Sequence, residues 1–231
     1  MIEPPVDPKI EAAAAILKGA VSAVPFVGGL IAEVGNLYLN PLEKRKQQWM
    51  AEVAHAIEEI HRRHSLLPES LQNDEKFVSF LYQATILALK NHQRQKITAL
   101  RGALVSVASP EQISEDLAFQ FLRYIDELSV THLSMLACLD KHAGQFAPME
   151  KLELVYDKIQ LYLDTAIERV AFRSFLHDLD ARFLIRLGDL EDLPEYASRK
   201  SFLEDEESKQ RQLEVTSLGR SFLSFINNDS P

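Results

Sequence analysis

The 231-residue chain has only 8 glycines, and its 46% hydrophobic and 26% charged residues are typical of a globular, helix-rich protein. A single cysteine, Cys138, excludes an internal disulfide and fits a reducing compartment. The net charge of -9 is uneven, because residues 1–110 are nearly balanced while residues 111–231 hold the acidic excess. The N-terminus, MIEPPVDPKIEAAAA, has acids and prolines where a signal peptide would be basic, so we expect a cytoplasmic protein.

Residues 9–39 are predicted to form an apolar hairpin broken by proline and glycine. The stretch GAVSAVPFVGGLIAEVGNLYL, residues 19–39, contains one charge, Glu33, and its charge-free part is shorter than the roughly 20 residues of a spanning helix. We therefore expect the hairpin to be packed in a helical core. The alternative is a hairpin that docks on or enters a membrane when triggered. For that alternative the candidate residues are Pro25, Phe26, Val27, Gly28, Gly29 and Leu30, with Lys44, Arg45, Lys46 and Trp49 at the lipid headgroups.

Apolar residues at helical spacing predict helices through the rest of the first half. The clearest is LEKRKQQWMAEVAHAIEEIHRRH, which starts after Asn40-Pro41. Asp74 is placed to cap a helix through FVSFLYQATILALKNH, and QRQKITALRGALVSVA continues it as one long helix or as two in line. Another helix, EQISEDLAFQFLRYIDEL, follows Pro110. The sequence thus predicts an N-terminal helical domain over residues 1–125.

The segment between Glu75 and Glu111 contains no acidic residue. Lys90, Arg94 and Arg101 are spaced by four and seven residues, which places them near one helical face with Lys96 to its side. A solvated surface is the simpler interpretation. The alternative is a face for an anionic partner, either nucleic acid or the acidic half of another copy, formed by Lys90, Arg94, Lys96 and Arg101.

Residues 126–231 have the element order of a winged helix. Ser129 caps the first of three helices, FLIRL reads as a strand, and QLEVTSLGRSFLSFI reads as a strand followed by a helix. The fold expected for the whole chain is mainly α, with a helical bundle followed by a winged-helix-like domain that has a small β-wing. Because the recognition helix, residues 168–182, is neutral and the wing, residues 188–211, is acidic, we expect no specific DNA binding.

Known catalytic and metal-binding patterns are not found in the sequence. Glu58 and His61 form a single Glu-x-x-His pair without the second copy of a di-iron bundle, and His61 and His64 lack a third ligand. Cys138 falls on an apolar helix face, as buried structural cysteines do. We expect no enzyme, no metal, no cofactor and no small-molecule substrate.

Three segments resemble known bacterial proteins. PFVGGLIAEVGNLYLNPLEKRKQQW resembles the opening of helical proteins of the abortive-infection alpha type, and DEKFVSFLYQATILALKNHQRQKITALRGAL is similar to the helical middle of their relatives. VTSLGRSFLSFI looks like the last strand and helix of prokaryotic winged helices. The resemblance implies a role in phage defence or growth arrest and brings no catalytic residues.

The expected function is therefore a non-enzymatic bacterial phage-defence or growth-arrest component. It would act through a protein partner or a homo-oligomer in the cytoplasm, with the surface of the inner membrane as an alternative location. The alternative function is a winged-helix DNA-binding transcriptional regulator.

Overall fold

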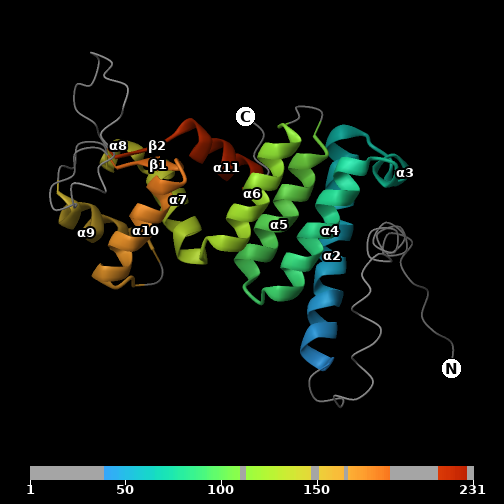
Figure 1. The fold of residues 1–231 in the computed structure, drawn as a ribbon, viewed down its shortest axis with the longest axis horizontal. Helices are drawn as coiled ribbons and strands as arrows, with labels where there is room; N and C mark the ends of the chain where they lie inside the picture. The colour runs from blue at the N-terminus through green and yellow to red at the C-terminus, as the bar shows by residue number, and fades with distance from the viewer. Residues whose placement is uncertain (1–38, 110–112, 147–150, 164–165, 188–212, 228–231) are drawn as a thin grey trace. The chain divides into compact units, whose positions relative to one another are not determined.

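The computed structural model describes residues 39–109, 113–146, 151–163, 166–187 and 213–227 (Figure 1). The described part is mainly helical, which confirms the predicted fold class at that level. The chain divides into two compact units, the first from Met1–Glu127 with Phe225–Pro231 and the second from Leu128–Ser224. The predicted hairpin, including Pro25, Phe26, Val27, Gly28, Gly29 and Leu30, lies outside the described residues except for Leu39.

Unit 1 is organised around α2 (Leu39–His64), which packs on both α4 (Glu75–Lys90) and α5 (Arg94–Val107). The short α3 (Pro68–Gln72) precedes α4, and α6 (Glu115–Glu127) packs on α4 and α5. Helix α2 begins at Leu39, a little before the expected start. Pro41 is tolerated there because the first turn of a helix needs no N–H from it for a helical hydrogen bond. The apolar stripe of α2, formed by Trp49, Val53, Ile57 and Ile60, is buried as its spacing indicates.

The predicted continuation of α4 into α5, as one helix or two in line, is wrong. Asp74 does cap α4, where its carboxylate accepts from the Phe77 N–H at 3.1 Å. At the other end the backbone of Asn91 and Gln93 is extended, and α5 turns back to lie beside α4 (Figure 1). The Asn91 amide donates to the Leu87 carbonyl at 2.9 Å and so satisfies one of the carbonyls that the helix end leaves open.

Unit 2 contains α7 (Val130–Lys141), α8 (Ala143–Phe146), α9 (Leu152–Tyr162), α10 (Arg169–Ala181) and most of α11 (Ser217–Asn227). Ser129 is the N-cap of α7, as predicted. Two short strands, β1 (Ile185–Arg186) and β2 (Glu214–Val215), pair antiparallel with Ile185 opposite Val215. The predicted acidic wing over residues 188–211 lies outside the described residues.

The last turn of α11 belongs to unit 1. The Phe225 ring lies 6.0 Å from that of Phe80 and 5.3 Å from that of Phe121, and the Ser106 hydroxyl donates to the Phe225 carbonyl at 2.9 Å. Unit 1 is therefore built from two separate parts of the chain. The expected C-terminal domain, residues 126–231, differs from unit 2 at both of its ends.

Candidate functional site

The fold brings two basic segments of unit 1 together that the sequence analysis treated separately. The Arg45 guanidinium, on α2, donates to the Leu89 carbonyl at the end of α4, at 3.3 Å. The start of α2 and the turn from α4 to α5 therefore lie at the same end of the bundle (Figure 1). We call this surface the basic end, and its residues are Lys44, Arg45, Lys46, Lys90, His92 and Arg94.

Most of the charge at the basic end is in contact with water. Lys44, Lys46, His92 and Arg94 are exposed, Arg45 is half-buried, and the Lys90 side chain is 60% exposed. Within the described ranges two ion pairs reach it, with Glu43 at 3.8 Å from the Lys46 ammonium and Asp126 at 3.8 Å from that of Lys90. Exposed ion pairs of this length contribute little. The surface thus remains net positive on a chain with a net charge of -9.

Lys96 does not belong to this surface, which corrects its place among the predicted anion-binding residues. Its side chain lies on the buried stripe of α5, and its ammonium donates to the Asp126 carbonyl at 2.7 Å. Loss of water around the ammonium lowers the pKa of Lys96, against a smaller opposing effect of the Asp126 carboxylate. Lys96 is a structural lysine that caps the carbonyl end of α6.

Two further predicted residues are engaged within unit 1. The Arg101 guanidinium is paired with Glu52 of α2 at 3.1 Å. Trp49 is only 1% exposed, and its indole N–H donates to the Thr85 hydroxyl at 2.9 Å. Trp49 is thus a core residue between α2 and α4 in this structure and does not lie at the surface, where the membrane alternative would place it.

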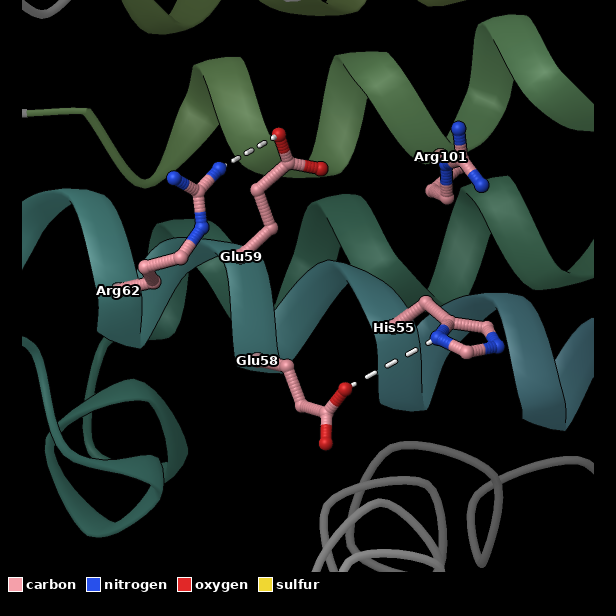
Figure 2. A pocket seen from close by; sticks show the side chains of 5 residues that line it. All are labelled: His55, Glu58, Glu59, Arg62 and Arg101. Atoms are coloured by element: carbon pink, nitrogen blue, oxygen red, sulfur yellow. Dashed lines mark ion pairs between the residues drawn. The ribbon is translucent and has the colours of Figure 1, made fainter.

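A pocket of about 410 Å³ lies between α2 and α5, away from the basic end. Figure 2 shows its lining of polar side chains, His55, Glu58, Glu59, Arg62 and Arg101. The Arg62 guanidinium pairs with the Glu59 carboxylate at 3.7 Å, and the His55 Nδ1 atom lies 3.9 Å from a Glu58 carboxylate oxygen. A ligand would have to displace these pairs.

No group of three His, Cys, Asp or Glu side chains among the described residues is arranged to hold a metal ion. His61, the histidine of the Glu-x-x-His pair, places its Nδ1 atom 3.0 Å from the Leu66 carbonyl oxygen. It is engaged at the end of α2.

The charges of α10 in unit 2 are sorted by face, which a count along the sequence does not reveal. The outward face consists of Val170, Arg173, Ser174, His177 and Ala181, all exposed and none acidic. Both carboxylates of the helix make contacts within unit 2, although the Asp178 side chain is still 47% exposed. Asp178 lies 3.4 Å from the His132 ring nitrogen, and Asp180 accepts from the Leu187 N–H at 3.4 Å. The helix is neutral overall, yet the face it presents to solvent is not acidic.

One cluster in unit 2 has the residue types of a catalytic triad, namely Ser129, His132 and Asp178. The contacts between Ser129 and His132 are, however, those of a helix cap. The Ser129 N–H donates to His132 Nδ1 at 3.1 Å, and the Ser129 hydroxyl lies 2.7 Å from the same nitrogen. The His132 N–H donates in return to the Ser129 hydroxyl oxygen at 3.4 Å, and these two backbone-to-side-chain bonds form the capping box of α7. The arrangement explains why a histidine is buried at this position.

Cys138 is buried, as predicted from its apolar helix face. Desolvation raises the pKa of its thiol, with Lys141 opposing that effect more weakly. A raised pKa disfavours the thiolate, so the environment is that of a structural cysteine.

Comparison with protein-family models, curated proteins and solved structures finds no match to this chain. The resemblance to abortive-infection proteins therefore stays a prediction. Within the described part of the chain, none of the helices combines the length and the apolar character needed to cross a bilayer.

Proposed function

We propose that this chain is a non-enzymatic interaction protein, a component of bacterial phage defence or growth arrest that works through protein contacts made by unit 2. The observation that carries the proposal is the exposure of large apolar side chains on α9 and α10. Leu161 is 78% exposed and Val170 is 83% exposed, the two highest values among the large hydrophobic residues described. Covering a side chain of this size with a partner contributes about 1.5–3 kcal/mol.

The order of elements in unit 2 supports a winged-helix arrangement as part of this proposal. Three helices of comparable size, α7, α9 and α10, precede β1, and β2 returns antiparallel to β1 before α11. In a winged helix α10 would be the recognition helix. Its outward face, with Val170 beside Arg173 and His177, offers a mixed apolar and polar surface of the kind that protein interfaces use.

A transcriptional regulator is the second candidate, and the absence of acid from the outward face of α10 favours it. Arg173 and His177 lie one helical turn apart on that face, where a recognition helix would read bases. Against it stands the acidic sequence of residues 188–211, which a phosphate backbone would repel if it forms a wing. We therefore place protein contacts first.

The experiment that tests the proposal is a phage-plating assay with variants that separate the two candidates. The phage should form fewer plaques on cells that express the wild-type chain. The double variant with Leu161→Asp and Val170→Asp should abolish that protection. Ile86→Asp is the matched control, because Ile86 is also an exposed apolar residue but lies on α4 in unit 1. Equal soluble amounts of each variant are verified in the same cells.

Arg173→Ala with His177→Ala should leave protection intact if protein contacts act. Loss of protection by this pair, together with a DNA motif enriched from a random pool by the wild type alone, would favour the regulator. Full protection by the Leu161 and Val170 variant would contradict the protein-contact proposal.

A further inference from the structure

The basic end of unit 1 is a surface assembled from two chain segments. The carbonyl of Leu89 holds Arg45 of α2 beside the turn that carries Lys90, His92 and Arg94. Neither segment alone has enough charge for a strong electrostatic site. Placed together, they form a net positive surface at one end of a packed bundle, and exposed cations so arranged attract a polyanionic surface.

The start of α2 adds to this positive potential. The helix has no acidic residue in its first turn, so no side chain there offsets the positive end of the helix dipole. Lys44, Arg45 and Lys46 follow within the next turn, although cations are disfavoured near this end of a helix. A bound anion would relieve the repulsion.

The position of the basic end in the chain indicates which anion it meets. Helix α2 begins at Leu39, which is also the last residue of the apolar stretch 19–39 with its single charge. Basic clusters next to apolar segments are typical of membrane surfaces, where cations meet lipid phosphates and apolar residues lie near the acyl chains. Nucleic acid offers phosphates without an apolar layer.

Single-stranded nucleic acids are commonly bound with aromatic rings that stack on bases. Among the described residues of the basic end the one ring is the imidazole of His92, since Trp49 is buried in the core of unit 1. A ligand that demands charge without stacking fits this surface better. Lipid headgroups meet that requirement.

We propose that the basic end of unit 1 binds the anionic surface of a lipid membrane, with the start of α2 and the α4–α5 turn both contacting headgroup phosphates. Binding is electrostatic at this surface and does not use α9 or α10. Membrane binding by unit 1 and protein contacts by unit 2 can therefore be tested independently of each other.

The test is flotation of the full chain with vesicles of phosphatidylcholine alone or of phosphatidylcholine mixed with phosphatidylglycerol. We expect binding only to the anionic vesicles, with a steep loss as salt rises. At low salt each removed charge should weaken partitioning about fivefold. Lys44→Gln with Lys46→Gln, and separately Lys90→Gln with Arg94→Gln, should each lower it about 25-fold.

The matched control is Arg62→Gln with Arg63→Gln. It removes the same charge from the far end of α2, about 24 Å along the helix axis from Lys46, and should leave binding unchanged. Circular dichroism melts of all variants verify folding. If a double variant is unstable, Lys44→Gln and Lys90→Gln alone should each give the fivefold loss.

Several results would overturn the proposal. One is no binding of the wild type to anionic vesicles, and another is equal loss in the control. Binding to neutral vesicles that the substitutions leave unchanged would assign the interaction to apolar insertion. Retention on DNA or RNA that exceeds vesicle binding, and that is lost on the same substitutions, would assign the surface to nucleic acid.

Discussion

Lys96 joins two helices of unit 1 through a buried charge. Its ammonium lies at the carbonyl end of α6, where a positive charge is favourable, and it satisfies the Asp126 carbonyl. The same burial removes water from the ammonium, and desolvation dominates the lowered pKa. Lys96 therefore fixes how α5 packs against α6. Desolvation of its ammonium lowers the stability of the folded chain at neutral pH.

That cost gives the stability a measurable pH dependence. Because the pKa of Lys96 in the folded chain is below its usual 10.5, the unfolded chain binds more protons between the two values. The free energy of unfolding should thus gain a favourable contribution as pH rises through this window. Lys96→Met should remove that contribution, measured by urea unfolding at a series of alkaline pH values.

Lys90→Met is the control for this measurement, since Lys90 is largely in water yet lies near the same carboxylate. It should keep the pH dependence of the wild type. Identical profiles for the wild type and Lys96→Met would contradict the desolvation of Lys96.

At the scale of elements, apolar spacing predicted the helices well, and capping residues such as Asp74 and Ser129 located their starts. The turn between α4 and α5 was missed, because Asn91, His92 and Gln93 do not mark a break as clearly as proline or glycine would. Lys96 was misassigned although a signal was present. It lies three and four residues before Ala99 and Leu100, on the buried stripe of its helix.

The candidate surfaces were less predictable than the helices. Lys44 and Lys90 could each be singled out as basic residues, but their proximity depends on the packing of α2 against α4. The neutral charge count of α10 was correct for the whole helix and uninformative about its outward face. Which face carries the acids depends on Asp178 and Asp180 contacting His132 and the backbone of Leu187.

Helix α11 approaches α5 so closely that only glycine fits at the contact. A Cβ atom on Gly102 would lie 1.9 Å from the Ile226 carbonyl oxygen and 2.7 Å from its carbon, both backbone atoms that cannot rotate away. Gly102→Ala should therefore lower the free energy of unfolding by about 1–3 kcal/mol, the usual cost of overpacking. Chemical denaturation measures the change.

Gly144→Ala is the matched control, because nothing lies within 4 Å of a Cβ at that position in α8. Its stability should be unchanged or raised by up to about 1 kcal/mol. An equal loss in both variants would show that the close approach of α11 to α5 does not determine the effect.

On the scale of the whole molecule, α11 contributes to the cores of both units. Phe222 and Leu223 are buried in its middle, and Phe225 and Ile226 are buried at its end. Ending the chain after Thr216 should expose Phe80 and Phe121, which pack on Phe225. We expect this truncated chain to aggregate and to bind a hydrophobic dye, measured by size-exclusion chromatography and fluorescence.

Leu218→Ala within the intact chain provides a milder comparison, because Leu218 is only partly buried on α11. We expect this variant to have the same oligomeric state as the wild type in size-exclusion chromatography. A truncated chain that melts at the wild-type temperature would show that α11 is dispensable for both cores.

The two-part construction of unit 1 also bears on how the protein is made in the cell. Phe225 and Ile226 leave the ribosome only after every residue of unit 2 has been translated. During that interval the nascent unit 1 lacks part of its aromatic core, because Phe80 and Phe121 have no Phe225 to pack on, and transiently exposed apolar surface of this kind favours aggregation. The core of unit 1 can therefore be completed only after α11 has been translated.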